Sequence, residues 1–521
     1  MNTFKEKLLK YYNMSEEQYL LFCKDVSYSD LKDSSNYRDI DKCVNFIKNC
    51  VEQKKKILIY GDYDCDGIMS TSILYLSIKT NDYTPGFYIP FRESDGYGLT
   101  KNNIDRFKNL GYEVLILIDN GITLNDEVEY AKSLGLSVII MDHHTVQESV
   151  PNADYILHPT YSSFSNINMC AGSVAFYFSV AYLGLIDDYL LTLSMISTIS
   201  DLMELNDQNR VLVKLGLKIL NKNKYPNIIK LLDHTELEIT EEDVSMSIAP
   251  KVNAIGRIIN DNKLFNIVRY FININDYEFI NKTSTWICDT NNYRKELVKT
   301  LCSSHQNIDE NEHSIIIFDE DMKEGLVGLL AARFMEQYQK PTVVLTSSQE
   351  DPSIYKGSIR SKDGFDVNII LSSLSDILAS YGGHQNAGGL SFKKENYELF
   401  KEKFENAAKK HPFTAENKEY INISLTDINN ENYKIIQTLA PFGQGFSKPE
   451  FVLKDIATSF LTTTKDNKHI IARLNPTSSL IYFNYDRSLF NEKKIDLYGT
   501  FRPNCFKGFY TMQFIIFGFH N

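Results

Sequence analysis

Residues 57–78 read ILIYGDYDCDGIMSTSILYLSI, an apolar run that leads through an acidic, glycine-bounded loop into a helix expected near 69–80. The same order returns at VLILI (114–118), followed by a helix expected near 125–134, and at VII (138–140). Continuous apolar runs rich in β-branched residues and separated by helices are typical of parallel strands buried on both faces. The sequence therefore predicts a doubly wound α/β domain.

Acidic side chains follow each of these three runs, and two histidines follow the third. In an open parallel sheet, ligands gather beyond the carboxyl ends of the strands, so we expect these side chains to share one crevice. So many carboxylates repel one another unless a cation neutralises them, and hard oxygen ligands mixed with imidazole suit Mn²⁺ or Mg²⁺. The candidates are Asp62, Asp64 and Asp66 after the first run, Asp119 after the second, and Asp142, His143 and His144 after the third.

Two simpler interpretations compete with a catalytic metal site. A calcium loop shares the D-x-D-x-D-G opening, but it needs a preceding helix and a Glu at its twelfth position, which counted from Asp62 is Ile73. Taken alone, Asp142-His143-His144 fits a capping acid followed by surface histidines about equally well. The three strand ends taken together favour the metal site.

The rest of the sequence divides into further units. Residues 1–50 are polar and weakly helical, and residues 265–310 predict a long connector helix. A second α/β unit is expected at 311–412, around the apolar runs SIIIF and TVVL. From 413 to 521, short aromatic and β-branched runs predict a small all-β module.

Composition and charge exclude several classes of protein. The 521 residues carry 55 Lys and Arg against 67 Asp and Glu, a formal net charge of −12, which argues against a protein that coats nucleic acid through bulk charge. Residues 441–521 nevertheless carry 10 Lys and Arg against 6 Asp and Glu, which allows a local basic groove. The 8 cysteines are scattered without a C-x-x-C pair, which indicates a reducing, cytoplasmic compartment. The uncharged stretch 170–186 contains glycine, serine and tyrosine, so we expect a buried helix and no membrane span.

Four motifs show a resemblance to a known superfamily. Asp62-x-Asp64-x-Asp66-Gly67, Asp119-Asn120-Gly121, Asp142-His143-His144 and the later Asp201 in ISTISDLMEL resemble the motifs of the DHH phosphoesterases. Six further segments are similar to those of the RecJ-type single-stranded-DNA exonucleases, and the resemblance runs from about residue 50 to residue 521. These segments are IPFRESDGYGL (89–99), AGSVAFYF (171–178), APKVNAIGR (249–257), KGSIRS (356–361), GGHQNAGGLSF (382–392) and APFGQGFSKPEF (440–451).

The resemblance implies an α/β fold with a C-terminal β-barrel. The catalytic domain would be a doubly wound parallel sheet, followed by a long connector helix, a second α/β DHH-associated domain and an OB-fold. The implied ranges are 1–50 for a helical lead-in, 51–264 for the DHH catalytic domain, 265–310 for the connector helix, 311–412 for the DHH-associated substrate-binding domain and 413–521 for the OB-fold single-strand-binding domain.

The resemblance also implies roles at the metal site, which would hold two ions of Mn²⁺ or Mg²⁺. One ion would be bound by Asp64 and Asp119, and the other by Asp66, Asp119, His143 and Asp201, with Asp119 bridging. Asp62 and His144 would be catalytic residues beside the ions, with His144 suited to contact a phosphate oxygen. Tyr60 departs from the pattern, because some members of the superfamily carry a His ligand at this position.

The resemblance also implies which residues bind the substrate. The implied phosphate-binding residues are Arg257, Ser358, Arg360, Gly382, Gly383 and His384. Nucleic-acid-binding residues of the all-β module would be Lys468, Arg473 and Arg502, which alternate with aromatic residues of which we expect about half to lie in the barrel core. Two departures concern this part of the sequence: Gly388 replaces the second Ala of the family's GGHxxAAG pattern, and Lys323 stands where a His is common.

The function that the resemblance implies is 5′→3′ exonucleolytic hydrolysis of single-stranded DNA to 5′-mononucleotides in DNA repair and recombination. The expected partners are single-stranded DNA, a helicase and a single-strand-binding protein, and the expected state is a cytoplasmic monomer. Two alternatives remain open at this stage. One is a phosphodiesterase for short oligonucleotides or cyclic dinucleotides, and the other is a DHH replication scaffold whose catalytic site has decayed.

Overall fold

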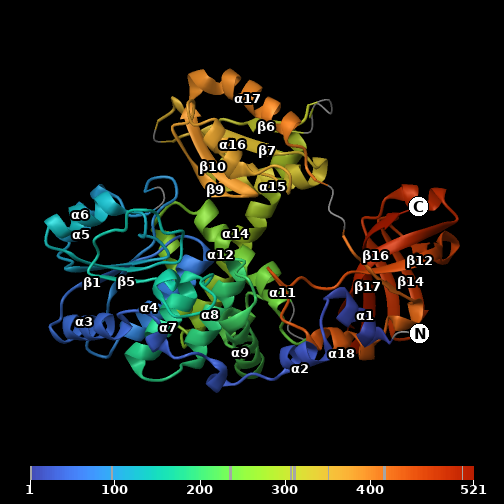
Figure 1. The fold of residues 1–521 in the computed structure, drawn as a ribbon, viewed down its shortest axis with the longest axis horizontal. Coiled ribbons are helices and arrows are strands. Elements are labelled where there is room, and N and C mark those ends of the chain that lie inside the picture. The colour runs from blue at the N-terminus through green and yellow to red at the C-terminus, as the bar shows by residue number, and fades with distance from the viewer. Residues whose placement is uncertain are drawn as a thin grey trace.

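The computed structural model describes residues 3–95, 98–233, 237–305, 308, 312–349, 351–414, 418–506 and 508–520. Three sheets, each with its own helices, follow one another along these residues (Figure 1). The first sheet has the strand order β2-β1-β3-β4-β5, and all of its strands are parallel. Its strands are β1 (Ile57–Tyr60), β2 (Gly86–Tyr88), β3 (Val114–Ile118), β4 (Ser137–Met141) and β5 (Tyr155–Leu157).

Helices cover both faces of this first sheet. Alternate residues of its strands enter different cores, so that Ile59 packs with α3 (Ile40–Glu52), α4 (Cys65–Ile78) and α7 (Ala171–Leu183). Leu58 packs on the other face with α5 (Lys101–Asn109) and α6 (Asn125–Ser133). The prediction of a doubly wound sheet is therefore confirmed. The helix expected near 69–80 begins earlier, at Cys65, because the Asp64 carboxylate caps it by accepting the Gly67 N–H at 3.0 Å.

A helical region completes the first α/β domain, which we call the catalytic domain after the role that the resemblance implies. This region comprises α8 (Asp188–Ser200), α9 (Asp207–Asn223), α10 (Pro226–Ile229), α11 (Glu241–Asp243), the π-helical turn η4 (Val244–Ile248), α12 (Ala249–Ile258) and α13 (Phe265–Ile272). The uncharged stretch that begins at Cys170 forms α7, whose first nine residues are all buried. Among the described residues, no helix combines the length and apolar character that a membrane span requires.

The long helix α14 (Tyr277–Ser304) lies between the catalytic domain and a second sheet (Figure 1). This second sheet has the order β6-β7-β8-β10-β9, in which β6 and β7 are parallel and the other neighbours antiparallel. Its strands are β6 (Ile315–Phe318), β7 (Thr342–Ser347), β8 (Ile354–Arg360), β9 (Ser380–His384) and β10 (Ala387–Lys393), and its helices are α15 (Glu324–Tyr338), α16 (Val367–Ser373) and α17 (Tyr397–Lys410).

The C-terminal module is a seven-stranded sheet of order β11-β12-β16-β17-β15-β14-β13. Its elements are β11 (Ile421–Ile423), α18 (Asn430–Thr438), β12 (Phe451–Ala457), β13 (Thr462–Thr463), β14 (His469–Asn475), β15 (Ser478–Phe483), β16 (Lys494–Phe506) and β17 (Phe509–His520). The first helices of the chain, α1 (Phe4–Tyr11) and α2 (Glu16–Cys23), lie beside this module (Figure 1), and Phe4 and Leu8 enter its core. The polar first 50 residues are thus shared between two cores, because α3 packs in the catalytic domain.

Candidate metal centre and nucleic-acid cavity

The loop after β1 brings three carboxylates to the edge of the sheet. It can turn back sharply because residue 67 is glycine: a Cβ there would lie 2.6 Å from the carbonyl oxygen of Asp62. Strands β1 and β3 are neighbours although β2 lies between them in sequence, and ligands bind where the strand order switches in this way. Asp119 follows β3 at this switch point, with a φ of 63°.

Asp66 is held by the start of a helix from the other half of the domain. Its two carboxylate oxygens accept the N–H groups of Ala171 at 2.9 Å and Gly172 at 2.8 Å, at the N-terminus of α7. Ser197 of α8 also donates its hydroxyl to this carboxylate. The helix dipole and three donors together stabilise a negative charge at this position and fix its orientation. A side chain at residue 172 is excluded, because its Cβ would lie 2.1 Å from the Ser197 Oγ.

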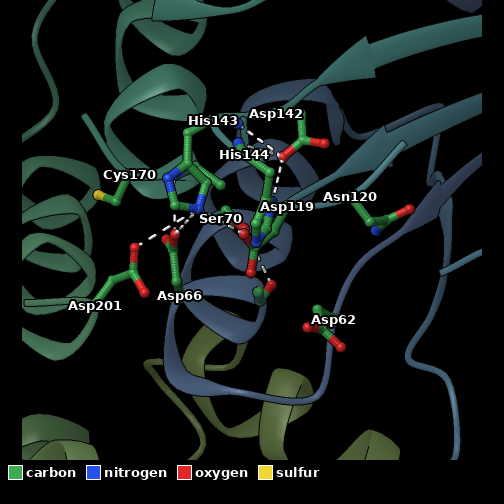
Figure 2. Close-up of polar contacts among 12 residues, drawn as sticks. Asp62, Asp66, Ser70, Asp119, Asn120, Asp142, His143, His144, Cys170 and Asp201 are labelled. Carbon is green, nitrogen blue, oxygen red and sulfur yellow. Dashed lines mark hydrogen bonds and ion pairs between the residues drawn. The ribbon is translucent and has the colours of Figure 1, made fainter. Parts of the chain in front are cut away.

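His143 lies among three carboxylates that come from different elements (Figure 2). Its Nε2 is 3.2 Å from Asp119 Oδ1, 3.6 Å from Asp66 Oδ2 and 3.6 Å from Asp201 Oδ2. One ring nitrogen can donate a single proton, so it cannot satisfy three acidic oxygens. Among the described residues, Asp201 Oδ2 is buried and has no hydrogen-bond partner. The donor set therefore has room for a cation that would satisfy these oxygens together.

His144 is oriented by a relay of neighbours. Its Nδ1 is 2.7 Å from Asp142 Oδ1, while Asp142 Oδ2 accepts the Ile122 N–H at 2.9 Å. His158 accepts the N–H of Thr160 on Nδ1 at 3.1 Å, so its Nε2 carries the proton and donates to the His144 carbonyl at 2.9 Å. The sequence patterns described above do not single out His158. Its signal is the position directly after β5, a strand that was not predicted.

Burial and neighbouring negative charges raise the pKa values of several carboxyl groups at the site. Burial and then the charge of Asp64 raise the pKa of Asp62 to about 7. Burial and then the charge of Asp66 raise the pKa of Asp201 to about 9, and the pKa of Asp119 is also raised, first by burial. Without a cation, the folded protein thus retains protons on acids that would ordinarily ionise well below neutral pH.

Two histidines respond to the same surroundings in opposite ways. Burial alone would lower the pKa of His144, but its hydrogen bond to Asp142 and the charge of that carboxylate raise it to about 9. Burial would in turn raise the pKa of Asp142, yet His144 lowers it below its ordinary value. The pKa of His143 is lowered, chiefly by burial, which favours the neutral ring that binds metal ions.

The described residues contain three groups of ligand atoms close enough to share an ion. These groups are Asp62, Asp64 and Asp119; Asp66, His143 and Asp201; and Asp119, Asp142, His143 and His144. Within each group the ligand atoms lie within 4.8 Å of one another. Carboxylate oxygens and imidazole suit Mn²⁺ or Mg²⁺, so the donor set fits these ions.

Tyr60, which departs from the family pattern, lies outside these groups. Its ring is buried in the core between the sheet and α5, and its hydroxyl donates to the Gly98 carbonyl at 2.7 Å. Tyr60 therefore packs in the core between the sheet and α5 and is not among the candidate metal ligands. Asp62 is the acid that completes the first group.

A cavity of about 760 Å³ lies between the catalytic domain and the second α/β domain. Of the predicted phosphate-binding residues, Arg257, Ser358, Arg360 and Gly382 line it. Arg360 donates to the Ser358 hydroxyl at 2.6 Å, and burial, followed by the charge of Arg92, lowers the pKa of Arg257 to about 10. Gathered guanidinium groups create a positive potential that suits an anion.

The other two predicted residues of this set lie apart. Gly383 and His384 are exposed near the end of β9 and are not among the described residues that line the cavity. Arg92, in contrast, was missed as a site residue and lines the cavity. Its guanidinium stacks 4.0 Å from the Tyr63 ring, and its Nε is buried with no hydrogen-bond partner among the described residues. Its sequence signal is a basic residue shortly after β2, which was too short to predict.

The two departures in the second domain have local explanations. A Cβ at Gly388 would lie 2.8 Å from Val367 Cγ1 and 3.0 Å from the Gly382 carbonyl oxygen, so α16 occupies the space that alanine would need. Lys323 precedes α15 and donates to the Ile258 carbonyl at 3.3 Å, at the end of α12. It therefore links the second domain to the catalytic domain.

The C-terminal sheet places two of the three predicted basic residues, Arg473 and Arg502, on one face. Arg473 pairs with Ser479, Ser479 with Gln513, and Gln513 with Arg502, so these residues form one row across four strands. Lys468 is exposed in the turn before β14.

Aromatic residues of this module divide between core and surface. Phe501 is buried in the core, whereas Phe483, Phe509 and Tyr510 are 52%, 77% and 62% exposed. Phe483, Arg502 and Tyr510 line a second cavity of about 710 Å³, whose other wall belongs to the catalytic domain. Exposed rings beside arginines are the features with which such sheets stack bases and track a phosphate backbone.

Comparison with known families follows the same three units. Residues 56–203 match the DHH family, N-terminal domain; residues 311–410 match the DHHA1 domain; and residues 421–517 match the RecJ OB domain. The first match covers the doubly wound domain, which is therefore a DHH-family domain. The three matched domains, in this order, are similar to those of the RecJ-type members of that family.

Relatives and solved structures agree with this assignment. The single-stranded-DNA-specific exonuclease RecJ of Bacillus subtilis (strain 168) is 30% identical over 467 residues, which cover 87% of this chain and 58% of that protein. RecJ of Haemophilus influenzae is 26% identical and covers 92% of this chain and 90% of that protein. The chain thus spans less than two thirds of the first relative and most of the second. The crystal structure of RecJ in complex with Mn²⁺ from Thermus thermophilus has the same fold, with a TM-score of 0.83, 20% identity and coverage of 99% of this chain and 76% of that one.

Proposed function

We propose that this protein is a metal-dependent 5′→3′ exonuclease that hydrolyses single-stranded DNA to 5′-mononucleotides in DNA repair and recombination. The observation that supports it best is the buried cluster of carboxylates and histidines at three strand ends, next to an arginine-lined cavity. The named relatives are single-stranded-DNA-specific exonucleases, and similar folds have been solved with Mn²⁺ and Mg²⁺.

In this proposal the chain's own acids hold two ions of Mn²⁺ or Mg²⁺. The ligands of the first ion are Asp64 and Asp119, with Asp62 beside them, and those of the second are Asp66, Asp119, His143 and Asp201. When bound, such ions activate water near neutral pH and stabilise the charge that develops on a phosphodiester under attack.

The remaining site residues bind and orient the strand. Arg257, Ser358 and Arg360 contact the terminal phosphate in the cavity that they line. His144, whose ring is oriented by Asp142, contacts an oxygen of the scissile phosphate. The row from Arg473 to Arg502 holds the strand farther from its end, together with Lys468.

Two other functions would explain fewer features of the molecule. A phosphodiesterase for short oligonucleotides or cyclic dinucleotides would have no use for the exposed rings and arginines of residues 421–517. A decayed scaffold would not keep a full set of buried acids at the cost of their mutual repulsion. We further propose that the protein is a cytoplasmic monomer that receives its strand from a helicase and a single-strand-binding protein.

The test is incubation with Mn²⁺ and a long single strand labelled at either end. We expect mononucleotides to be released from the 5′ end and the activity to disappear with EDTA. The isosteric variants Asp119→Asn and His143→Gln should abolish hydrolysis while circular dichroism stays unchanged, and Asp126→Asn, which alters an exposed acid of α6, should behave as wild type. Cleavage of dinucleotides alone would favour the second activity, and turnover by Asp119→Asn would refute the proposed site.

A further inference from the structure

A buried arginine binds the link between α18 and β12 to the catalytic domain. Arg210, on α9, is only 8% exposed. Its guanidinium donates hydrogen bonds to the carbonyl oxygens of Leu439 at 2.6 Å, Ala440 at 3.0 Å and Pro441 at 2.9 Å. Three consecutive carbonyls of the C-terminal module are therefore satisfied by one side chain of the catalytic domain.

Aromatic rings from the N-terminal segment also pack around Arg210 and the link. The guanidinium carbon of Arg210 lies 4.1 Å from the ring centroid of Phe22, on α2, and 5.3 Å from that of Phe446. The ring of Tyr12 stacks on Phe446 with centroids 4.7 Å apart. We call Arg210, Phe22 and residues 439–448 the joint.

Other residues of the catalytic domain bind the same link. Glu241 Oε1 accepts the N–H of Phe442 at 3.0 Å, and the N–H of Leu205 donates to the Gln444 carbonyl at 3.0 Å. Lys448 forms an ion pair with Glu242 at 2.9 Å. The link is therefore bound along most of its length, and it coincides with the segment APFGQGFSKPEF that the metal site does not use.

Burying an arginine side chain is unfavourable, because its charged group loses hydration. Burial lowers the pKa of Arg210 to about 10, because the charged form loses hydration. An apolar side chain could provide contact area without this desolvation. What a guanidinium adds is a planar set of donors with fixed directions, which sets the orientation of the carbonyls that it binds.

The joint lies between the two halves of the proposed substrate path. On one side the link enters β12, which pairs with β16, the strand of Arg502. On the other side the link binds Leu205, which follows the proposed metal ligand Asp201 in the same loop. The orientation of the joint therefore determines where the strand-binding face stands relative to the metal centre.

We propose that Arg210 is a positioning residue that holds the C-terminal strand-binding face in register with the metal centre, so that one DNA strand engages both. This inference rests on the proposed function. Two linked sites give a gain in apparent affinity only while the geometry allows both to be occupied at once. A strand too short to reach the C-terminal module gains nothing from the joint.

The test compares Arg210→Met with wild type on two 5′-phosphorylated strands. One strand has about 30 nucleotides, which exceeds the site of a single OB fold, and the other has about 4. We expect kcat/KM on the long strand to fall about 10- to 100-fold, mainly through KM, and kcat/KM on the short strand to stay within about 2-fold. Arg269→Met, which alters an exposed arginine of α13, is the matched control and should change neither value.

Each outcome decides for or against the inference. An equal loss on both strands would show that Arg210 only stabilises the catalytic domain, and no loss on the long strand would show that the joint does not position the face. Should Arg210→Met fail to fold, Arg210→Lys, which keeps the charge but not the planar fork, is measured in the same way. If the wild type degrades neither strand, the proposed function fails, and this inference fails with it.

Discussion

Replacing Asp201 with asparagine should stabilise the metal-free protein at alkaline pH. The carboxyl group has an ordinary pKa of 3.8 in the unfolded chain, and burial with the charges of Asp66 and Asp64 raises it to about 9 in the folded protein. Between these two pKa values the folded state holds one more proton than the unfolded state. The free energy of unfolding therefore falls as pH rises, by about 1.4 kcal/mol per pH unit for one such group.

The size of the effect follows from that slope. Raising the pH from about 6 to about 8 stays inside the window, so Asp201 alone lowers the stability of the wild type by up to about 3 kcal/mol. Neighbouring acids titrate together with it, and we expect a measured difference of about 1–3 kcal/mol. The asparagine variant has no proton to lose at this position, so its advantage over the wild type should grow with pH by that amount.

The assay is urea unfolding in EDTA at the two pH values. The chain has a single tryptophan, Trp286 of α14, which packs against the core of the catalytic domain, so its fluorescence reports the unfolding of that domain. Asp126→Asn serves as the control and should show no pH-dependent gain. An advantage of Asp201→Asn that is absent, or that shrinks as the pH rises, would refute the reasoning. Added Mn²⁺ should reverse the order, because the ion replaces the protons in the wild type and binds the variant more weakly.

Further substitutions test other parts of the site. Tyr60→Phe removes the donor to the Gly98 carbonyl and should lower the free energy of unfolding by about 1 kcal/mol, while Mn²⁺ affinity measured by calorimetry stays unchanged; a loss of affinity would contradict the placing of Tyr60 outside the metal centre. His158→Ala removes the donor to the His144 carbonyl and should lower kcat by about 10- to 100-fold with the fold intact, and His158→Gln, which keeps an N–H donor, should recover part of the loss. Equal kcat values for wild type and His158→Ala would show that the orientation of His144 does not depend on this contact.

The clustering of most candidate metal ligands could be predicted from sequence because these residues follow strands with a strong local signal. Four or five consecutive apolar residues at β1, β3 and β4 predict buried parallel strands, and the carboxyl ends of such strands meet at one edge. Asp201 had no such signal, because it follows α8 and joins the cluster only through the packing of that helix. Its assignment came from the resemblance alone.

The residues that were missed share a physical cause. Arg92 and His158 follow β2 and β5, two edge strands of three residues each, and so short a run has no recognisable period. The packing of α1 and α2 on the C-terminal module was likewise hidden, because a sequence pattern shows that a helix has an apolar side and not which distant surface covers it. Contacts of this kind are set by tertiary structure.

The packing of Phe4 and Leu8 in the core of the C-terminal module has a consequence for the order in which the chain folds. The ring of Phe4 contacts those of Phe451 and Phe501, more than 400 positions later, so a ribosome must have synthesised these partners before Phe4 can be buried. Contacts between segments so far apart form late and slow the search for the native state. The catalytic domain can close around its own sheet while synthesis continues, whereas α1 and α2 must wait for the strands of the C-terminal module. Newly made chains would expose these apolar residues longest, and we expect chaperones to recognise them at this stage.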